Sequence, residues 1–369
     1  IYQEKLPPEE LRQIQLEYMA LEDSPDGYNA FYEAIYSRPP PEHVIGWVRD
    51  IYEAHSLTLD TLIEAFRGST KSTTMECFII KRMSHDPEKT NLIISAGGDD
   101  ANKIARGIAN IIEYSPVYKR IFPHIVKDPS GKWGDDSGYD IWDNRILHDE
   151  WIGETTAREG RIPTLLGVGY NSTSLPGPHP TGVCLIDDYH NEGNTRTDRK
   201  AQTAMVIFTD TIMPMIDQPD VWYILIGTPW NFKDVIAKTK NRKYIKHIFT
   251  PLIEGETWPE KWTPDFIDLE KDRVGSSIGW ARMYDLDLEK TRGMTLKKEW
   301  IHYWPHEELE MYGQDWPILI GVDYTSTEDP TRQVGDYFAL AIGRVIPGGR
   351  GVVVFDGIRL KLPRAEAED

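Results

Sequence analysis

A lysine followed by hydroxyl residues, in the stretch EAFRGSTKSTT (64–74), is the first place where this sequence could do chemistry. Lys71 and Ser72 match the end of the phosphate-binding pattern G-x-x-x-x-G-K-[ST], but Ala65 and Thr70 occupy its two glycine positions. In such a loop the backbone N–H groups surround phosphates, the lysine reaches the β- and γ-phosphates, and the hydroxyl binds Mg²⁺. The alternative is an exposed lysine in a polar turn at a helix N-terminus. A preceding apolar strand and a following helix-compatible run favour an ATP site, whose candidate residues are Arg67, Gly68, Ser69, Thr70, Lys71, Ser72 and Thr73.

Two consecutive acids end an apolar strand in VCLIDDYHNE (183–192). In a P-loop ATPase the first acid, here Asp187, holds Mg²⁺ with the loop hydroxyl, and the second, here Asp188, acts on the attacking water. ATPases usually use glutamate for this second role, so Glu192, four residues on, remains an alternative. An ordinary strand that ends in solvated acids is the other interpretation. The presence of the lysine stretch and the acid pair in one α/β pattern favours a nucleotide site.

Two further strand ends carry candidate residues. Thr228 follows the apolar strand of ILIGTPW (224–230), at an edge where α/β sheets place ligands, so it either senses the γ-phosphate or simply begins a proline turn. Asp323 ends ILIGVD (318–323), and a carboxylate there suits a nuclease that holds two Mg²⁺ or Mn²⁺ ions. One acid cannot hold two metals. Asp336 and Asp356 lie on the neighbouring strands, although acids at strand edges are usually solvated.

The elements that must position these residues alternate between apolar and helix-compatible runs. This alternation predicts an α/β fold with a mainly parallel sheet covered on both faces. The predicted strands are 61–66, 90–97, 164–169, 181–188 and 221–230. A helix is expected over 99–114, with Asp99 or Asp100 as its N-cap. After Pro317, strands at 318–324, 336–345 and 351–360 predict an antiparallel meander.

Composition separates the chain into segments and limits the class of protein to which it can belong. We expect a helical N-terminal arm (1–40), an ATPase domain (41–250), a helical connector rich in tryptophan, proline and charge (251–316) and the beginning of another domain (317–369). Because the chain begins with Ile1, we expect it to be part of a longer polypeptide. No apolar run approaches the roughly 18 residues of a membrane-spanning helix. Cys77 and Cys184 have no metal-site spacing, which favours a reducing compartment. The net charge of −18 argues against a simple DNA-binding module but allows a local basic path.

Five motifs in order resemble the large terminase subunit of tailed double-stranded DNA bacteriophages. They are FRGSTKST, LIDDYHNE, ILIGTPW, WPEKWTPDFIDLEKDR and ILIGVDYTSTED…GDYFALAIG, and the resemblance covers about residues 40–369. It implies an ASCE-type P-loop ATPase domain joined to an RNase H-like nuclease domain that is incomplete here, since its remaining acids would lie beyond Asp369. It also implies roles for Arg67 as the deviant loop arginine, for Thr228 in coupling hydrolysis to movement, and for Asp323 as the first nuclease acid.

The resemblance implies a motor that uses ATP and Mg²⁺ to package viral double-stranded DNA into a prohead, with a metal-dependent endonuclease that cuts concatemeric DNA. The implied partners are double-stranded DNA, a portal protein, a small terminase subunit and further copies of the chain in a pentameric ring. The implied location is the host cytoplasm, with transient docking on the prohead.

The sequence also departs from the family pattern. Thr70 stands where glycine usually precedes the lysine, and LPGPHPT (175–181) lacks the arginine often found before the acid pair. The arginine finger therefore stays unassigned among Arg158, Arg161, Arg196 and Arg199. Two other functions remain open: a helicase-like P-loop translocase without nuclease activity, and a non-catalytic scaffold that binds capsid or portal.

Overall fold

The computed structural model forms two compact units, Ile1–Gly293 and Met294–Asp369. It describes residues 6–156, 162–175, 177, 179–216, 220–292, 303–323, 338–347 and 351–360. None of the helices within these ranges combines the length and apolar composition that crossing a membrane requires.

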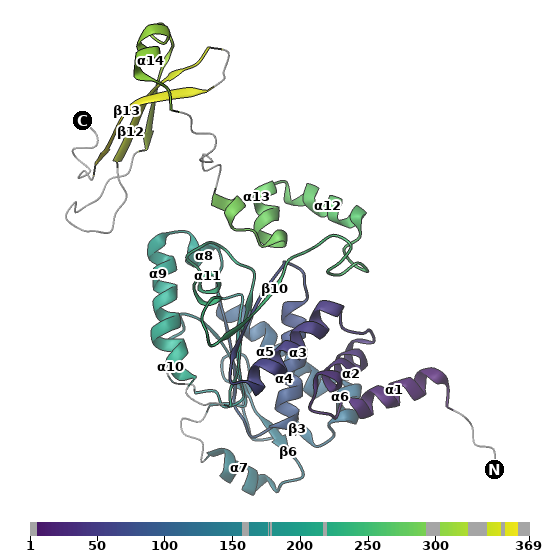
Figure 1. Cartoon of the computed structure of the whole chain (residues 1–369). Helices are drawn as coiled ribbons and strands as arrows, with labels where there is room; N and C mark the ends of the chain where they lie inside the picture. The colour runs from purple at the N-terminus through teal and green to yellow at the C-terminus, as the bar shows by residue number, and fades with distance from the viewer. Residues whose placement is uncertain are drawn as a thin grey trace. The chain divides into compact units, whose positions relative to one another are not determined.

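An eight-stranded sheet organises the first unit (Figure 1). Its order is β10 (Ile245–Thr250), β1 (Asp60–Ala65), β9 (Trp222–Gly227), β8 (Val183–Asp187), β2 (Asn91–Ser95), β7 (Leu165–Gly169), β5 (Gly138–Tyr139) and β4 (Trp133–Gly134). The strands from β10 to β7 run parallel, whereas β5 and β4 are added antiparallel at one edge. The predicted α/β fold with a mainly parallel sheet is confirmed.

Helices cover both faces of this sheet. On one side lie α3 (Glu42–Ser56), α4 (Lys71–His85) and α5 (Gly98–Tyr114), and on the other lie α9 (Asp198–Ile207) and α10 (Met213–Met215), which the π-helical turn η1 (Phe208–Ile212) joins (Figure 1). Successive residues of β1 enter different cores, Leu62 on the α9 side and Ile63 on the α4 side. Strands buried on both faces read as continuous apolar runs, which is why the sequence shows them so clearly.

The start of α5 differs from the prediction. Its N-cap is Gly97, without a side-chain cap, and Asp99 and Asp100 lie in the first turn, so neither is the predicted N-cap. The helix begins earlier because its first residue packs closely against the end of β7. A Cβ on Gly169 would lie only 2.9 Å from the backbone nitrogen of Gly98. The two acids still favour this helix end, because their charge lies near its positive dipole.

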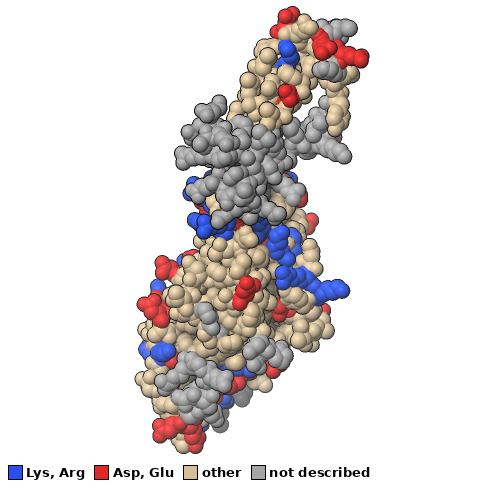
Figure 2. Space-filling model, turned by 90° about the vertical axis from the view of Figure 1, so that its left-hand side faces the viewer, with Lys and Arg blue, Asp and Glu red and all other residues tan. Residues whose placement is uncertain are grey.

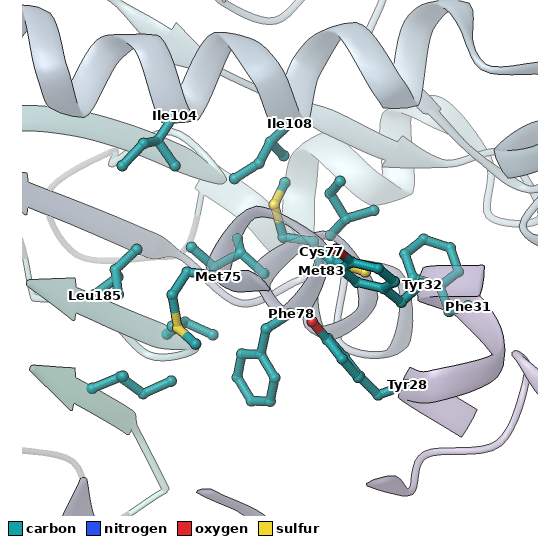
Figure 3. Close-up of a cluster of buried hydrophobic side chains, with 14 of the residues drawn as sticks. Tyr28, Phe31, Tyr32, Met75, Cys77, Phe78, Met83, Ile104, Ile108 and Leu185 are labelled. Atoms are coloured by element: carbon teal, nitrogen blue, oxygen red, sulfur yellow. The ribbon is translucent and has the colours of Figure 1, made fainter. Parts of the chain in front are cut away.

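The N-terminal helices α1 (Pro8–Met19) and α2 (Pro25–Tyr36) belong to the first unit. Tyr28, Phe31 and Tyr32 of α2 are fully buried in the same core as Phe78 of α4 (Figure 3). The helix α6 (Pro116–Ile121) completes this aromatic layer, with Tyr118 against Phe31. Residues 20–36 therefore help to hold the helix that follows the lysine stretch.

The remaining elements of the first unit are short. A two-stranded sheet of β3 (Ile125–Lys127) and β6 (Ile141–Asp143) precedes α7 (His148–Thr156), and α8 (Glu192–Thr195) and α11 (Val235–Thr239) follow two strands of the main sheet. The segment 251–292 holds α12 (Pro264–Val274), α13 (Ser277–Trp280), the π-helical turn η2 (Ala281–Asp285) and the 3-10 turn η3 (Glu289–Arg292). It packs a separate core of Leu252, Trp262, Ile267 and Tyr284 around Phe66.

The second unit contains α14 (His306–Tyr312) and a three-stranded sheet of β11 (Ile318–Asp323), β12 (Phe338–Val345) and β13 (Val352–Leu360). The strands pair antiparallel in the order β11-β12-β13, as the predicted meander requires. A β-bulge interrupts the register of β12 and β13 between Ile342 and Gly343.

Candidate nucleotide-binding site

The carboxyl ends of four neighbouring strands bring the predicted residues of the first unit together. In the order β1-β9-β8-β2, these ends lead to the lysine loop (residues 67–73), to Thr228, to the acid pair and to Ser95. Parallel strands end at one edge of a sheet, and open α/β sheets bind ligands at that edge. The predictions from the sequence therefore converge on one site.

The lysine loop turns sharply into α4. Gly68 and Thr70 both have left-handed backbone conformations, with φ of 83° and 65°. Thr70 is the N-cap of α4, yet no side chain caps this helix end. Its N–H groups and the positive end of the helix dipole are thus available to an anion.

Lys71 points back from α4 toward the end of β9. Its Nζ donates a hydrogen bond to Thr228 Oγ1 at 3.0 Å, and this hydroxyl donates to the Ala65 carbonyl at 2.8 Å. Lys71 is only 8% exposed, and no carboxylate of the described ranges forms an ion pair with it. A buried cation that no carboxylate contacts directly is costly, so this position suits a lysine that binds an anion.

Ser72 joins the lysine loop to the acid pair. Its Oγ donates to Asp187 Oδ2 at 3.0 Å across a sequence separation of 115 residues. Asp187 is 5% exposed, and its Oδ1 has no hydrogen-bond partner. Burial and the neighbouring charge of Asp188 raise the pKa of Asp187, against the opposing influence of Lys71.

This donor set fits Mg²⁺. A hydroxyl and a carboxylate with a free oxygen are ligands that Mg²⁺ accepts, and the ion usually takes one or two carboxylates and completes its shell with phosphates and water. The described residues hold no cluster of three or more His, Cys, Asp or Glu side chains that could hold a metal ion. Ser72 and Asp187 would be the protein ligands of Mg²⁺.

Asp188 and Glu192, the alternatives for positioning water, lie in different surroundings. Asp188 adopts a left-handed conformation with φ of 42°, and its Oδ1 accepts a hydrogen bond from the Thr228 N–H at 3.2 Å. It lines a cavity of about 260 Å³ that Ser72 and Asp187 also line. Glu192 is the exposed first residue of α8 and is not among the residues that line this cavity. The geometry favours Asp188.

The same cavity contains residues that sequence reasoning missed. Glu76 lies one helical turn after Ser72 on α4, and burial raises its pKa to about 7. Ser95 ends β2 beside Asp187, and its Oγ is buried without a partner. The i,i+4 spacing from Ser72 could have identified Glu76. A cavity of about 680 Å³ beside β7 is larger, but none of these residues line it.

The segment 251–292 holds the lysine loop from the other side. The Arg67 N–H donates to the Met283 carbonyl at 2.8 Å, and Lys261 Nζ donates to the Gly68 carbonyl at 2.9 Å. His43 Nε2 lies 3.0 Å from the Ser69 carbonyl. The arginine predicted to act in the loop is exposed, and its guanidinium contacts the Met283 sulfur at 3.4 Å.

The remaining candidates are arginines of the first unit and acids of the second unit, and some of them lie outside the described residues. Arg196, which directly follows α8, and Arg199 of α9 are exposed, while Arg158 and Arg161 lie outside the described residues. Asp323 ends β11 opposite Ala339, and its side chain lies outside the described structure, as does Asp336. Asp356 is exposed on β13 opposite Ile342.

Comparisons with known proteins give structural similarity only. No protein-family model matches the chain, and no curated protein matches it. The chain is similar to the large terminase ATPase domain of Thermus phage P74-26, with 11% identity, a TM-score of 0.45, and 69% of this chain and 96% of that chain covered. It is similar to the HK97 bacteriophage large terminase, with 12% identity, a TM-score of 0.46, and coverage of 91% and 67%. The Phi-28 gp11 DNA packaging motor matches at 13% identity and a TM-score of 0.34, over 78% and 74% of the two chains.

Proposed function

We propose that the first unit is an ATPase that drives movement of double-stranded DNA. The observation that carries the ATPase assignment is the Ser72–Asp187 hydrogen bond, which joins the lysine loop to the acid pair beside an unpartnered carboxylate oxygen. Such a pairing of a loop hydroxyl and a strand-end acid is the arrangement that P-loop ATPases use around a magnesium nucleotide.

Each residue then has a role that its contacts support. The N–H groups of the lysine loop and the Lys71 side chain would bind the β- and γ-phosphates of ATP, while Ser72 and Asp187 would hold Mg²⁺. Mg²⁺, when bound, neutralises charge that develops on the phosphates. Asp188 orients the attacking water, because its carboxylate lies in the cavity beside Ser72 and is fixed by the Thr228 N–H.

Thr228 is the residue that couples the chemistry to movement. Its hydroxyl accepts from Lys71, and its N–H donates to Asp188. One residue at the end of β9 thus contacts both the group that binds the terminal phosphate and the group that orients water. Loss of that phosphate would change both contacts, and the backbone that follows Thr228 would then shift.

We extend this to packaging of viral DNA into a prohead, with a portal, a small terminase subunit and a ring of copies as partners. The resemblance of the motifs to large terminases supports this step. The chain carries a net charge of −18, yet Figure 2 shows lysines and arginines gathered near the middle of the view. A DNA-translocating motor needs only such a local basic path, because tight static binding would stop it from moving along the DNA.

An ATPase assay of the chain with DNA and proheads tests the proposal. Lys71→Ala and Asp188→Asn should each lower turnover roughly 100-fold, the scale seen when one preorganised group is removed from a transition state. Lys119→Ala, at an exposed lysine of α6, is the matched control. A wild-type protein without turnover under these conditions would refute the motor and favour a non-catalytic scaffold.

A second activity, metal-dependent DNA cleavage by the second unit, is proposed from the antiparallel meander whose first strand ends at Asp323. A carboxylate at such a strand end suits a two-metal nuclease. The test is cleavage by the full-length protein in Mg²⁺ or Mn²⁺, with Asp323→Ala beside Asp315→Ala, an exposed acid in the turn before β11. Cleavage that survives Asp323→Ala would refute the assignment, and absent cleavage with intact ATP turnover would favour a helicase-like translocase.

A further inference from the structure

Three basic residues lie in or beside the lysine loop. They are Arg67, Lys71 and Arg282, and none of them forms an ion pair with a carboxylate in the part of the chain that the structure describes. Lys71 is buried, and Arg282 is partly buried. Burial and the nearby charge of Arg67 lower the pKa of the Arg282 guanidinium. Like charges held together in a partly desolvated place are unfavourable unless an anion joins them.

Arg282 is held in place by contacts of its own and of its neighbour. Its guanidinium stacks on the Trp230 ring at 4.2 Å from the centroid, and its NH1 lies 3.5 Å from the Pro229 carbonyl. It belongs to the π-helical turn η2, a rare conformation that recurs at functional sites. The next residue, Met283, accepts the hydrogen bond from the Arg67 N–H, so this turn is tied directly to the lysine loop.

These contacts hold Arg282 beside the residues that follow Thr228 at the end of β9. The γ-phosphate must lie where Lys71, which binds it, and Asp188, which orients water toward it, both reach. Thr228 contacts both of these residues. Pro229 and Trp230, the two residues that contact Arg282, follow Thr228 immediately in the chain.

We propose that Arg282 is a second phosphate-binding residue, which contacts the terminal phosphate of bound ATP through its planar guanidinium. This inference rests on the proposed ATPase function. Stacking on Trp230 orients the guanidinium plane, so two of its N–H groups can face two phosphate oxygens, an arrangement that lysine cannot reproduce. Because Arg282 lies on the segment 251–292, that segment would distinguish ATP from ADP directly.

Nucleotide affinity of the 369-residue chain tests the proposal without requiring turnover. Isothermal titration with the non-hydrolysable analogue AMP-PNP and with ADP, both in Mg²⁺, compares wild type with Arg282→Gln and Arg282→Lys. The matched control is Arg273→Gln, at an exposed arginine of α12 that pairs with Glu270. The thermal midpoint without nucleotide is measured for each variant, which separates a folding defect from a binding defect.

Arg282→Gln should weaken AMP-PNP binding about tenfold or more, as loss of one charge-assisted hydrogen bond predicts, and ADP binding less than about threefold. Arg282→Lys should fall between Arg282→Gln and wild type, and Arg273→Gln should match wild type. Equal losses for both nucleotides, or no loss relative to Arg273→Gln, would overturn the assignment of Arg282. If wild type and Lys71→Ala alike bind neither nucleotide, the proposed ATPase function fails as well. If Lys71→Ala abolishes binding while Arg282→Gln does not alter it, only this inference falls.

Discussion

Replacing Glu76 with glutamine should stabilise the ligand-free protein above neutral pH. Glu76 lies between α4 and α5, where a Cβ on Gly107 would come within 3.0 Å of its Oε1, so there is little room for water on that side. Burial raises the pKa of Glu76 from 4.5 to about 7, and the nearby charge of Lys103 offsets only part of this effect. Glutamine keeps the shape of the side chain and removes the charge that burial disfavours.

The size and sign of the effect follow from proton linkage. The folded chain holds the proton of Glu76 up to about pH 7, whereas the unfolded chain releases it near 4.5. Stability is therefore lost as the pH rises through this window, and the loss amounts to about 3 kcal/mol above it. At pH 5 most of this loss of stability has not yet occurred, so the free energies of unfolding of the wild type and Glu76→Gln should differ by less than about 1 kcal/mol.

Urea unfolding in EDTA, followed by circular dichroism at pH 5 and pH 8, measures the difference between the two proteins. Because both carry the same second unit, its contribution cancels in the comparison. Glu10→Gln, on an exposed position of α1, is the control and should change stability at neither pH. A Glu76→Gln difference that is equal at the two pH values, or that has the opposite sign at pH 8, would refute the reasoning.

Three further predictions concern the core of the first unit. Phe78→Ala should lower the free energy of unfolding by about 3–5 kcal/mol, because Phe78 is 1% exposed and packs against Tyr28; a loss under about 1 kcal/mol in urea would contradict this. Cys77 and Cys184 are buried and burial raises the pKa of both thiols, so a thiol reagent should label neither in the native chain and both in denaturant; rapid native labelling would show exposure that the structure lacks. Burial lowers the pKa of Lys81 from 10.5 to about 8. Between these two pH values only the unfolded chain keeps the proton, so the stability of the wild type relative to Lys81→Met should rise as the pH rises. A stability difference in urea unfolding that does not change with pH would contradict this.

The sequence predicted those features of the fold that depend on the residues of a single strand or helix. The central strands are buried on both faces, so their apolar runs predicted strands and a parallel sheet directly. Strand order is a tertiary property, and the two-residue strands β5 and β4 are too short to show any pattern. Likewise the N-cap of α5 depends on the packing of Gly98 against Gly169, which no local pattern contains.

The same distinction between local pattern and tertiary packing applies to the residues of the candidate site. Lys71, Asp187 and Thr228 each follow or end an apolar strand, so topology alone brings them to one sheet edge. Arg282 lies within a helical turn, where charged residues are usually solvated, so only packing reveals it. Glu76 lies four residues after Ser72 on α4, a spacing that the sequence does contain. Arg282 reaches the site because the segment 251–292 folds back on Phe66, which is a contact between distant parts of the chain.

This folding back also accounts for the missing glycines of the lysine loop. Ala65 is the last residue of β1, paired in register with Thr250, so its position needs no glycine. Thr70 does adopt a left-handed conformation, which costs a residue with a Cβ about 1–2 kcal/mol. Its hydroxyl donates to the Ser69 carbonyl at 2.6 Å, and Lys261 fixes the Gly68 carbonyl just before it. Strain of this size persists where surrounding contacts determine the backbone. Contacts with the segment 251–292 therefore help to hold the left-handed turn of the lysine loop without the two glycines.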